Sequence, residues 1–476
     1  MIGEQRMAQA VGNSLMARIK GLAQLWRGIA GRGGDEVVLA PDLPEGDLGP
    51  LRGQMQACLE SRGGEVTARA RAAALGRAYL ALNPEGRSRF LRLLAEEFGP
   101  ERNEIDAAIE HLHAADGDDR AEAERRLRQA LEPPRLKLLT GFNALPEGVK
   151  FLVDMRAELI DQVKSDTALA ALEGDLKGLL AAWFDVGFLE LQRITWRSPA
   201  AVLEKIMVYE AVHAIQGWDD LKNRLDSDRR LYGFFHPRMP DEPLIFVEVA
   251  LVRGIAGNVQ ELLDPTAPVG DPTQADTAIF YSITNAQKGL AGISFGNFLI
   301  KRVVDDLSRE FVRLKTFATL SPIPGFRAWL NERLAQGERG MLAQSEHRAL
   351  TGLSNGRLGA KGSLKAILAD PDWVKQPALV EALRGPLLRL AARYLVSERR
   401  ADGRSLDPVG HFHLSNGARV ERLNWLADQS PKGLAQSCGL MVNYLYKLDH
   451  IEANHEAYSA SGKVAASSEV KALAKG

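Results

Sequence analysis

Apolar positions recur at helical spacing through the first third of the chain. Glycine, proline and charged residues separate seven such segments, which span 47–62, 64–82, 83–98, 101–115, 118–131, 146–164 and 166–183. The third is the clearest, because Asn83 suits an N-cap, Pro84 suits the first helical position, and Gly99-Pro100 ends the apolar stripe. The pattern predicts an all-helical first domain over residues 1–184.

The hydrophobic period changes near Asp185. Shorter apolar or alternating segments predict strands at 188–196, 231–237, 243–252, 277–284, 312–320, 411–425 and 439–448. Helical patterns lie between them at 200–215, 297–309, 324–336, 362–370 and 376–400. Strands mixed with helices in this way predict a second domain over residues 185–476, built on one largely antiparallel sheet.

Composition agrees with two folded domains and narrows the class of protein. The chain has 476 residues, of which 45% are hydrophobic and 25% charged, as in soluble globular proteins. Sixty Lys and Arg residues balance 61 Asp and Glu residues, so neither nucleic acid nor a membrane is expected as a partner. No apolar run is long enough to span a bilayer.

Cysteine usage and the N-terminal segment bear on location. Cys58 and Cys438 are the two cysteines, which fits a reducing compartment, so we expect a cytoplasmic protein without disulfides or a zinc site. Residues 1–34 carry several basic side chains around apolar ones. We interpret them as an ordinary first helix with a loose tail, because Glu4 and the lack of a cleavage-like site disfavour a transit peptide.

Residues 277–307 combine an apolar strand, a glycine loop and an amphipathic helix. Gly289, Gly292 and Gly296 fall in the loop, and the helix from about 297 carries apolar residues on one side. Bare backbone N–H groups and the positive end of a helix can together bind a phosphate, although such loops also serve simply as tight turns. N-acetyltransferase-like folds have an R/Q-x-x-G-x-G/A loop here, from which this chain departs at Ala291 and Ser294.

A serine at a strand end is the first candidate for chemistry. Pro322 forces Ser321 into an extended conformation, which would fix its hydroxyl at the end of the strand 312–320. Two interpretations remain open from the residues alone: a site residue, or a serine that bonds its own loop. No G-x-S-x-G elbow accompanies it, so a hydrolase of that kind is not supported.

Histidines and late aromatic residues give further candidates. His411 and His413 would share a face of the predicted strand 411–425, but no third ligand lies at suitable spacing for a metal. An acid–base role and a structural role both remain open for them. Asn443, Tyr444 and Tyr446 lie on the last predicted strand, where alternating aromatic residues usually form core. His111 and His113 lie two apart on a predicted helix, where we expect solvated side chains.

The second domain resembles malonyl-CoA decarboxylases in an ordered set of strings. These are MVYEAVH, HPRMPDEPLIFVEVAL, FYSIT, FLIKRVV, TLSPIPGF, DPVGHFHLSNGA, NWLAD and SCGLMVNY, which lie between about Leu191 and Val470. The first domain is similar to the helical domain of that family in its layout. The resemblance implies an α+β protein: an all-helical oligomerisation domain, then an N-acetyltransferase-like (GNAT) mixed-sheet catalytic domain. It also implies self-association, typically as a homotetramer.

The resemblance further implies an activity and a set of site residues. The reaction is decarboxylation of malonyl-CoA to acetyl-CoA and carbon dioxide, with no cofactor, since coenzyme A is part of the substrate. The implied catalytic residues are Ser321 and His413, with Tyr446 associated with the site. The implied CoA-binding residues are Ala291, Gly292, Ile293, Ser294, Phe295, Gly296 and Asn297, with Ser321 and His413 also contacting substrate. Some relatives carry an acidic residue where this chain has Ser294, so that carboxylate has no counterpart here.

Two other functions fit the same fold. An acyl-CoA-dependent acyltransferase would bind CoA but would need room for an acceptor and often a carboxylate base. A non-catalytic acyl-CoA sensor would bind CoA without releasing carbon dioxide, and the presence of both Ser321 and His413 counts against it.

Overall fold

The computed structural model describes residues 20–31, 37–60, 64–293, 298–337, 341–353 and 363–475. The chain forms two compact units. The first comprises residues up to Glu190 together with Phe235–Leu244 and Ala286–Ser294, and the second comprises Leu191–Phe234, Ile245–Asn285 and Phe295–Gly476. None of the helices within the described ranges is long and apolar enough to cross a membrane. The domain boundary expected at residue 184 stays a prediction.

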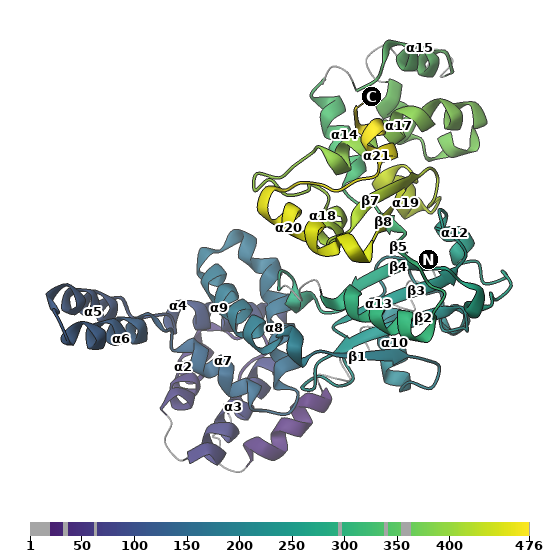
Figure 1. The fold of residues 1–476 in the computed structure, drawn as a ribbon. Coiled ribbons are helices and arrows are strands. Elements are labelled where there is room, and N and C mark those ends of the chain that lie inside the picture. Colours follow the sequence, from purple (N-terminus) through teal and green to yellow (C-terminus); the bar gives the residue numbers. More distant parts are fainter. Residues whose placement is uncertain are drawn as a thin grey trace. The chain divides into compact units, whose positions relative to one another are not determined.

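The first unit is helical, as the period of its apolar residues predicts (Figure 1). Asn83 and Asp166 cap two of its helices by accepting hydrogen bonds from backbone N–H groups of the first turn. The helices are α2 (Glu45–Leu59), α3 (Gly64–Ala81), α4 (Pro84–Glu97), α5 (Arg102–Ala114), α6 (Asp119–Leu131), α7 (Arg135–Asn143), α8 (Gly148–Gln162) and α9 (Thr167–Trp183). His111 and His113 are exposed on α5, as expected.

Helix α7 was not expected from the sequence. Pro133 and Pro134 suggest a linker, but they precede the helix, where a proline is tolerated because the first N–H groups have no intrahelical partner. Arg135 is buried at its start, where Nε lies 2.6 Å from Asp175 Oδ2 and Nη1 donates to the carbonyl of Ala95. Edge-to-face aromatic contacts fill the core of the unit, with Phe151 touching the rings of Trp26, Tyr79 and Phe142.

The second unit contains a mixed sheet with helices around it. The strand order is β1-β2-β3-β4-β5-β8-β6, and β7 pairs with β8. The strands are β1 (Glu190–Ile194), β2 (Arg229–Phe235), β3 (Ile245–Val252), β4 (Thr277–Asn285), β5 (Thr316–Thr319), β6 (Ser321–Pro322), β7 (Arg419–Asn424) and β8 (Met441–Leu445). The β4–β5 pair is parallel, whereas β2–β3, β3–β4, β5–β8, β6–β8 and β7–β8 are antiparallel. The expected α+β class with a largely antiparallel sheet is therefore confirmed, and the sheet is consistent with an N-acetyltransferase-like fold.

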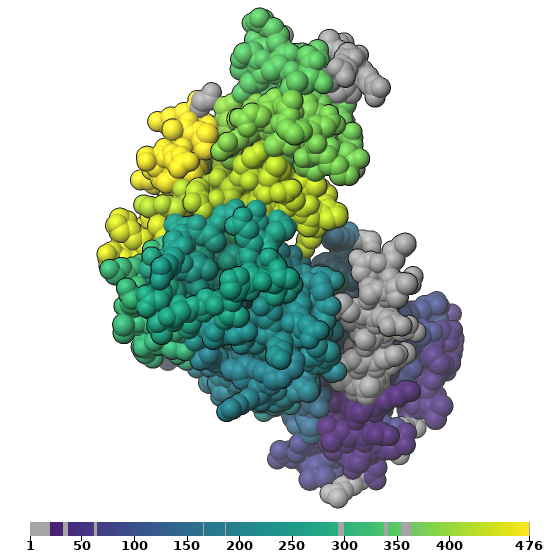
Figure 2. Space-filling view, turned by 90° about the vertical axis from the view of Figure 1, so that its right-hand side faces the viewer, coloured from purple at the N-terminus to yellow at the C-terminus, as the bar shows by residue number. Residues whose placement is uncertain are grey.

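Segments far apart in sequence build this unit together. In Figure 2 the teal surface of the middle of the chain adjoins the yellow-green surface of its C-terminal part. The helices are α10 (Ala200–Tyr209), α11 (Trp218–Arg224), α12 (Val259–Leu262), α13 (Phe298–Glu310), α14 (Phe326–Ala335), α15 (Gln344–Leu353), α16 (Ser363–Ala369), α17 (Pro377–Val396), α18 (Pro408–Ser415), α19 (Pro431–Ser437), α20 (Ile451–Ser461) and α21 (Ser468–Lys475). Helix α13 lies against the sheet, where Asp306 accepts a 2.8 Å hydrogen bond from Tyr232 of β2 (Figure 1).

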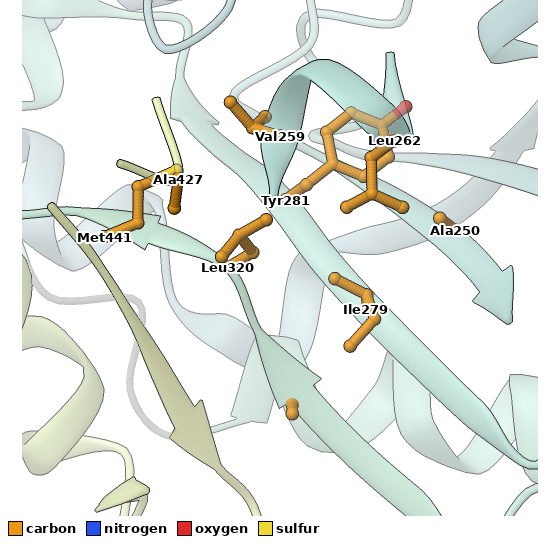
Figure 3. Packing of buried hydrophobic residues seen from close by; sticks show 9 residues of the cluster. Ala250, Val259, Leu262, Ile279, Tyr281, Leu320, Ala427 and Met441 are labelled. Atoms are coloured by element: carbon orange, nitrogen blue, oxygen red, sulfur yellow. The ribbon is translucent and has the colours of Figure 1, made fainter. Parts of the chain in front are cut away.

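One apolar cluster fixes the centre of the sheet. It comprises Ala250, Val259, Leu262, Ile279, Tyr281, Ala318, Leu320, Ala427 and Met441 (Figure 3). Its members come from β3, β4, β8 and α12, from β5 and the residue after it, and, at Ala427, from the segment between β7 and α19, so the cluster packs these segments together.

Strands β4 and β5 part at one end, and this opening positions the site. Their parallel pairing runs from Thr277↔Thr316 to Phe280↔Thr319, while β4 continues to Asn285. The β3–β4 register shifts between Glu248 and Val249, which pair with Ser282 and Phe280 and leave Tyr281 unpaired. An extra residue of this kind bends a strand, and it lies directly after Phe280, where the pairing of β4 with β5 ends.

Candidate active site

A cavity of about 220 Å³ lies where β4 and β5 part. Strand β4 supplies one wall, Ser321 and Pro322 of β6 supply another, and the first turns of α18 close it. The lining residues are Val212, Phe280, Tyr281, Ile283, Asn285, Ser321, Pro322, Pro408, Val409, Phe412 and His413. The cavity is mostly apolar with a few convergent polar groups, which is the usual composition of a small-molecule site.

Ser321 and His413 meet on the wall of this cavity. The Ser321 Oγ atom lies 3.1 Å from His413 Nε2, although 92 positions separate the two residues in the chain. Both side chains are buried, with exposed fractions of 6% and 3%. Ser321 is extended because β6 pairs with β8 and because Pro322 follows it, as the sequence predicts.

A chain of hydrogen bonds extends from this pair in both directions. The Tyr446 hydroxyl lies 2.7 Å from His413 Nδ1, and the Ser321 hydroxyl donates to Thr319 Oγ1 at 2.8 Å. One direction satisfies every contact: Tyr446 donates to Nδ1, the Nε2–H of His413 donates to Ser321, and Ser321 donates to Thr319. The N–H of Tyr444 also donates to Thr319 Oγ1, at 3.1 Å, so that oxygen is held from two sides.

Burial makes His413 neutral in the free protein. Desolvation lowers the pKa of His413 to about 3, because its ring is enclosed by aromatic side chains. The Tyr444 ring stacks on it with centroids 4.5 Å apart, and Phe412 and Tyr446 contact its edges. Burial also raises the pKa of the Tyr446 hydroxyl well above its ordinary value, so Tyr446 is protonated and can donate to Nδ1.

A short segment after α10 closes the cavity beside Val212. Glu210 is its anchor, since Oε1 accepts from the N–H groups of Val212 and His213, both at 2.7 Å. Its Oε2 accepts from the hydroxyls of Ser282 at 2.8 Å and Thr284 at 3.1 Å, both on β4. One buried carboxylate thus ties the segment to the strand that forms the opposite cavity wall.

Comparison with known proteins agrees across both units. The family model "Malonyl-CoA decarboxylase C-terminal domain" matches residues 187–476, and "Malonyl-CoA decarboxylase N-terminal domain" matches residues 98–184. The mitochondrial malonyl-CoA decarboxylase of Mus musculus is 38% identical over 450 residues, covering 91% of this chain and 88% of its own. That of Anser anser anser is 38% identical over 400 residues, covering 81% and 79%.

Solved structures give the same result. A malonyl-CoA decarboxylase from Rhodopseudomonas palustris matches with a TM-score of 0.82 and 44% identity over 89% of this chain and 99% of its own. One from Agrobacterium vitis matches with a TM-score of 0.80, the same identity and the same coverage. The chain belongs to the malonyl-CoA decarboxylase family.

The structure brings together the three residues that the family resemblance implies for catalysis. Ser321, His413 and Tyr446 form one hydrogen-bonded series, in which Ser321 and His413 line the cavity and Tyr446 contacts His413 from outside the lining. Their roles in the family reaction remain predictions. Of the implied CoA-binding residues, Ala291, Gly292 and Ile293 are described, and they follow the short 3-10 turn Lys288–Leu290 that comes after β4. Ser294, Phe295, Gly296 and Asn297 lie outside the described residues.

The predicted strand over 411–425 is wrong in its first half. Residues Pro408–Ser415 form α18, because Asp407 caps the helix by accepting from the N–H of Gly410 and Pro408 occupies its first turn. His411 and His413 therefore do not share a face. His411 Nδ1 lies 2.8 Å from the Tyr458 hydroxyl, away from the cavity lining.

Two polar residues of the site were not singled out from the sequence. Thr319 lies two residues before Ser321 in an extended segment, so both side chains point to the same face, and this spacing could have identified it. Glu210 follows α10 within the string MVYEAVH, where we expected the helix to continue to residue 215. Within the described residues, no group of three or more His, Cys, Asp or Glu side chains is arranged to hold a metal ion.

Proposed function

We propose that this protein is a carboxy-lyase that converts malonyl-CoA to acetyl-CoA and carbon dioxide. The observation that carries the proposal is the 3.1 Å contact between Ser321 and His413 on the cavity wall, in a chain of this family. The relatives in mouse and goose and the solved bacterial structures bear the name of this activity.

The thioester supplies the electron sink for the reaction. The bond between the carboxylate carbon and the α-carbon breaks, carbon dioxide leaves, and the electron pair passes into the thioester carbonyl as an enolate. The α-carbon then takes one proton and becomes the methyl group of acetyl-CoA. The reaction needs no cofactor as an electron acceptor, because the thioester carbonyl of the substrate accepts the electron pair of the breaking bond.

The protein has to orient the malonyl group and deliver that proton. The mostly apolar cavity favours loss of the carboxylate charge as neutral carbon dioxide. We assign proton delivery to His413, with Ser321 as relay and orienting group at 3.1 Å. General acid catalysis of this kind contributes about 10²–10⁴ in rate.

His413 has to gain its proton when substrate binds. Its pKa in the free protein is about 3, because burial disfavours the charged form. The anionic malonyl carboxylate would face the imidazole in the same cavity and would raise that pKa, as an opposite charge does at short range. One proton therefore enters with each substrate, which matches the one proton that each turnover consumes.

Incubation with malonyl-CoA alone tests the function. We expect carbon dioxide and acetyl-CoA in equal amounts, with one deuterium in the acetyl methyl group when the solvent is D₂O. An acyltransferase would need an amine or other acceptor before it released CoA, and an acyl-CoA sensor would bind the ligand without releasing carbon dioxide. Absence of carbon dioxide from a folded, CoA-binding protein contradicts the proposal.

Assembly and location are proposals of the same kind. We propose a homotetramer formed through the helical unit, which light scattering on the purified protein tests. We propose a cytoplasmic location, for which the unpaired Cys58 and Cys438 give support, since reducing compartments keep thiols free. The relatives in mouse and goose carry the description mitochondrial. Fractionation of the native cell therefore tests the proposed cytoplasmic location of this protein.

A further inference from the structure

The segment after β4 makes a defined turn within the helical unit. The N–H of Ile293 donates to the carbonyl of Leu290 at 3.1 Å. Ala291 has φ −57° and ψ 134°, and Gly292 has φ +72°. These are the angles of a type II turn, whose third position needs the left-handed conformation that glycine adopts freely.

Arg156 of α8 holds this turn from the helical side. Its guanidinium donates to the carbonyl of Gly289 at 2.6 Å and to that of Ala291 at 2.9 Å. Glu173 of α9 accepts from Nε at 3.0 Å and from Nη2 at 2.5 Å, which fixes the guanidinium plane. Arg156 is only 2% exposed, so its contact with the turn belongs to the buried interior of the unit.

The backbone of Gly289 also packs tightly against α8. A Cβ at this position would lie 1.8 Å from the carbonyl oxygen of Val153, so only glycine fits. The turn is therefore fixed to the helical unit by close packing and by a bidentate arginine.

The arginine contact determines the direction of one backbone N–H. In a type II turn the central peptide has its carbonyl on one side and its N–H on the other. Arg156 donates a hydrogen bond to the carbonyl of Ala291, so the N–H of Gly292, on the other side of the same peptide, points away from Arg156. An N–H fixed in this way is a preorganised donor for an anion.

Lys177 of α9 places a positive charge beside the same glycine. Its Nζ lies 3.3 Å from the position that a Cβ on residue 292 would occupy. Lys177 is exposed, and among the described residues no carboxylate forms an ion pair with it. An ammonium group beside a fixed backbone donor is an arrangement that suits a phosphate oxygen.

We propose that the helical unit takes part in binding the phosphates of coenzyme A. Lys177 contacts a phosphate directly, and Arg156 is a positioning residue that holds the Gly292 N–H toward the same group. The inference rests on the proposed function for the identity of the ligand. It gives the helical unit a role in substrate binding in addition to the expected role in self-association.

Calorimetry with coenzyme A and with pantetheine tests the proposal without any need for turnover. Pantetheine lacks the nucleotide and all the phosphates. We expect Lys177→Gln to weaken CoA binding about tenfold, in line with loss of one charged hydrogen bond, and to leave pantetheine binding as in the wild type. Lys164→Gln is the matched control, because Lys164 is an exposed lysine of the same unit, and CoA should bind it as it binds the wild type.

Arg156 needs a variant that avoids an unpaired buried charge. The double variant Arg156→Met with Glu173→Gln removes both members of the pair, and a thermal melt shows whether it folds. We expect weaker CoA binding and unchanged pantetheine binding. In turnover assays we expect a higher KM for malonyl-CoA to account for the loss in kcat/KM. Arg156→Lys keeps the charge and should recover part of the affinity.

Three results would overturn the proposal: unchanged CoA affinity in Lys177→Gln, unchanged CoA affinity in the folded double variant, or equal weakening of CoA and pantetheine. A wild type that binds CoA but releases no carbon dioxide from malonyl-CoA would instead overturn the proposed function.

Discussion

The hydroxyl oxygen of Tyr446 lies 2.7 Å from Nδ1 of His413, and both side chains are almost fully buried. Tyr446 follows β8 directly and His413 lies on α18, so two elements of the second unit fix the orientation of the imidazole ring. With Nδ1 accepting from Tyr446, Nε2 carries the proton that faces Ser321. Tyr446 thus sets the tautomer of the residue to which we assign proton delivery.

Tyr446→Phe should lower kcat roughly 10–100-fold, since loss of a buried hydrogen bond costs about 1–3 kcal/mol and each 1.4 kcal/mol is about tenfold in rate. Steady-state assays of carbon dioxide release measure the change. Tyr458→Phe is the matched control, because Tyr458 makes a similar 2.8 Å contact with His411 away from the cavity lining. Equal losses in the two variants would contradict a specific role for Tyr446.

Thr319→Val should lower kcat about tenfold. Valine has a similar shape but cannot accept the hydrogen bond that the Ser321 hydroxyl donates to Thr319 Oγ1 at 2.8 Å. The Ser321 hydroxyl would then lose its fixed direction. Thr319→Ser keeps the acceptor and should recover most of the rate. If Thr319→Ser were as slow as Thr319→Val, the defect would come from packing and the hydrogen bond would not be its cause.

His413 should remain neutral in the free protein between pH 5 and 8, because burial lowers its pKa from the ordinary 6.5 to about 3. Nitrogen NMR of histidine-labelled protein measures this directly, with His413→Gln to assign the signal. A stable malonyl-CoA analogue should shift the signal to that of imidazolium. Titration of His413 near pH 6.5 without ligand would contradict the account.

The same lowered pKa affects stability. Between about pH 3 and 6.5 the unfolded chain binds a proton at residue 413 that the folded protein does not bind. The contribution of neutral His413 to the free energy of unfolding is therefore complete above pH 6.5 and is lost as the pH falls through this range. The free energy of unfolding should fall by up to about 1.4 kcal/mol per pH unit there. His413→Gln should show a shallower slope in urea denaturation, and an equal slope would count against neutral burial.

Glu210→Ala should destabilise the protein by about 3 kcal/mol, because two backbone N–H groups and two hydroxyls lose their acceptor. Glu210→Gln keeps an oxygen for the N–H groups of Val212 and His213 and should cost less. Urea denaturation compares the two. Equal stability of Glu210→Ala and the wild type would contradict the anchoring role of this carboxylate.

The sequence predicted most elements of the sheet but not the geometry around the histidine. The apolar runs that became β2, β3 and β4 can be recognised locally, because each is a short, almost continuous run of apolar and aromatic residues, as expected for a strand that is buried on both faces. The segment at 408–415 contains aromatic and branched residues typical of strands, yet the Asp407 cap and Pro408 start a helix there. A helix cap is the signal of a single side chain. When the sequence is analysed over a longer segment, several strand-forming residues outweigh that one signal.

Contacts between distant segments were beyond the reach of pattern alone. Ser321 was a candidate from Pro322, but only the family resemblance paired it with His413 over 92 positions. The bulge at Tyr281 lies where the pairing of β4 with β5 ends, and no residue type marks such a bulge in the sequence. The contact between Arg156 and the Leu290–Ile293 turn joins segments more than 130 positions apart.

The central claim is that Ser321 and His413 together protonate the thioester enolate. Its most direct test is kcat for carbon dioxide release from malonyl-CoA by Ser321→Ala and His413→Ala, beside the CoA dissociation constant of each and with His411→Ala as control. We predict that kcat falls about 100-fold or more in both variants, while CoA binding and the control stay as in the wild type. Near-native turnover by either variant would contradict the account.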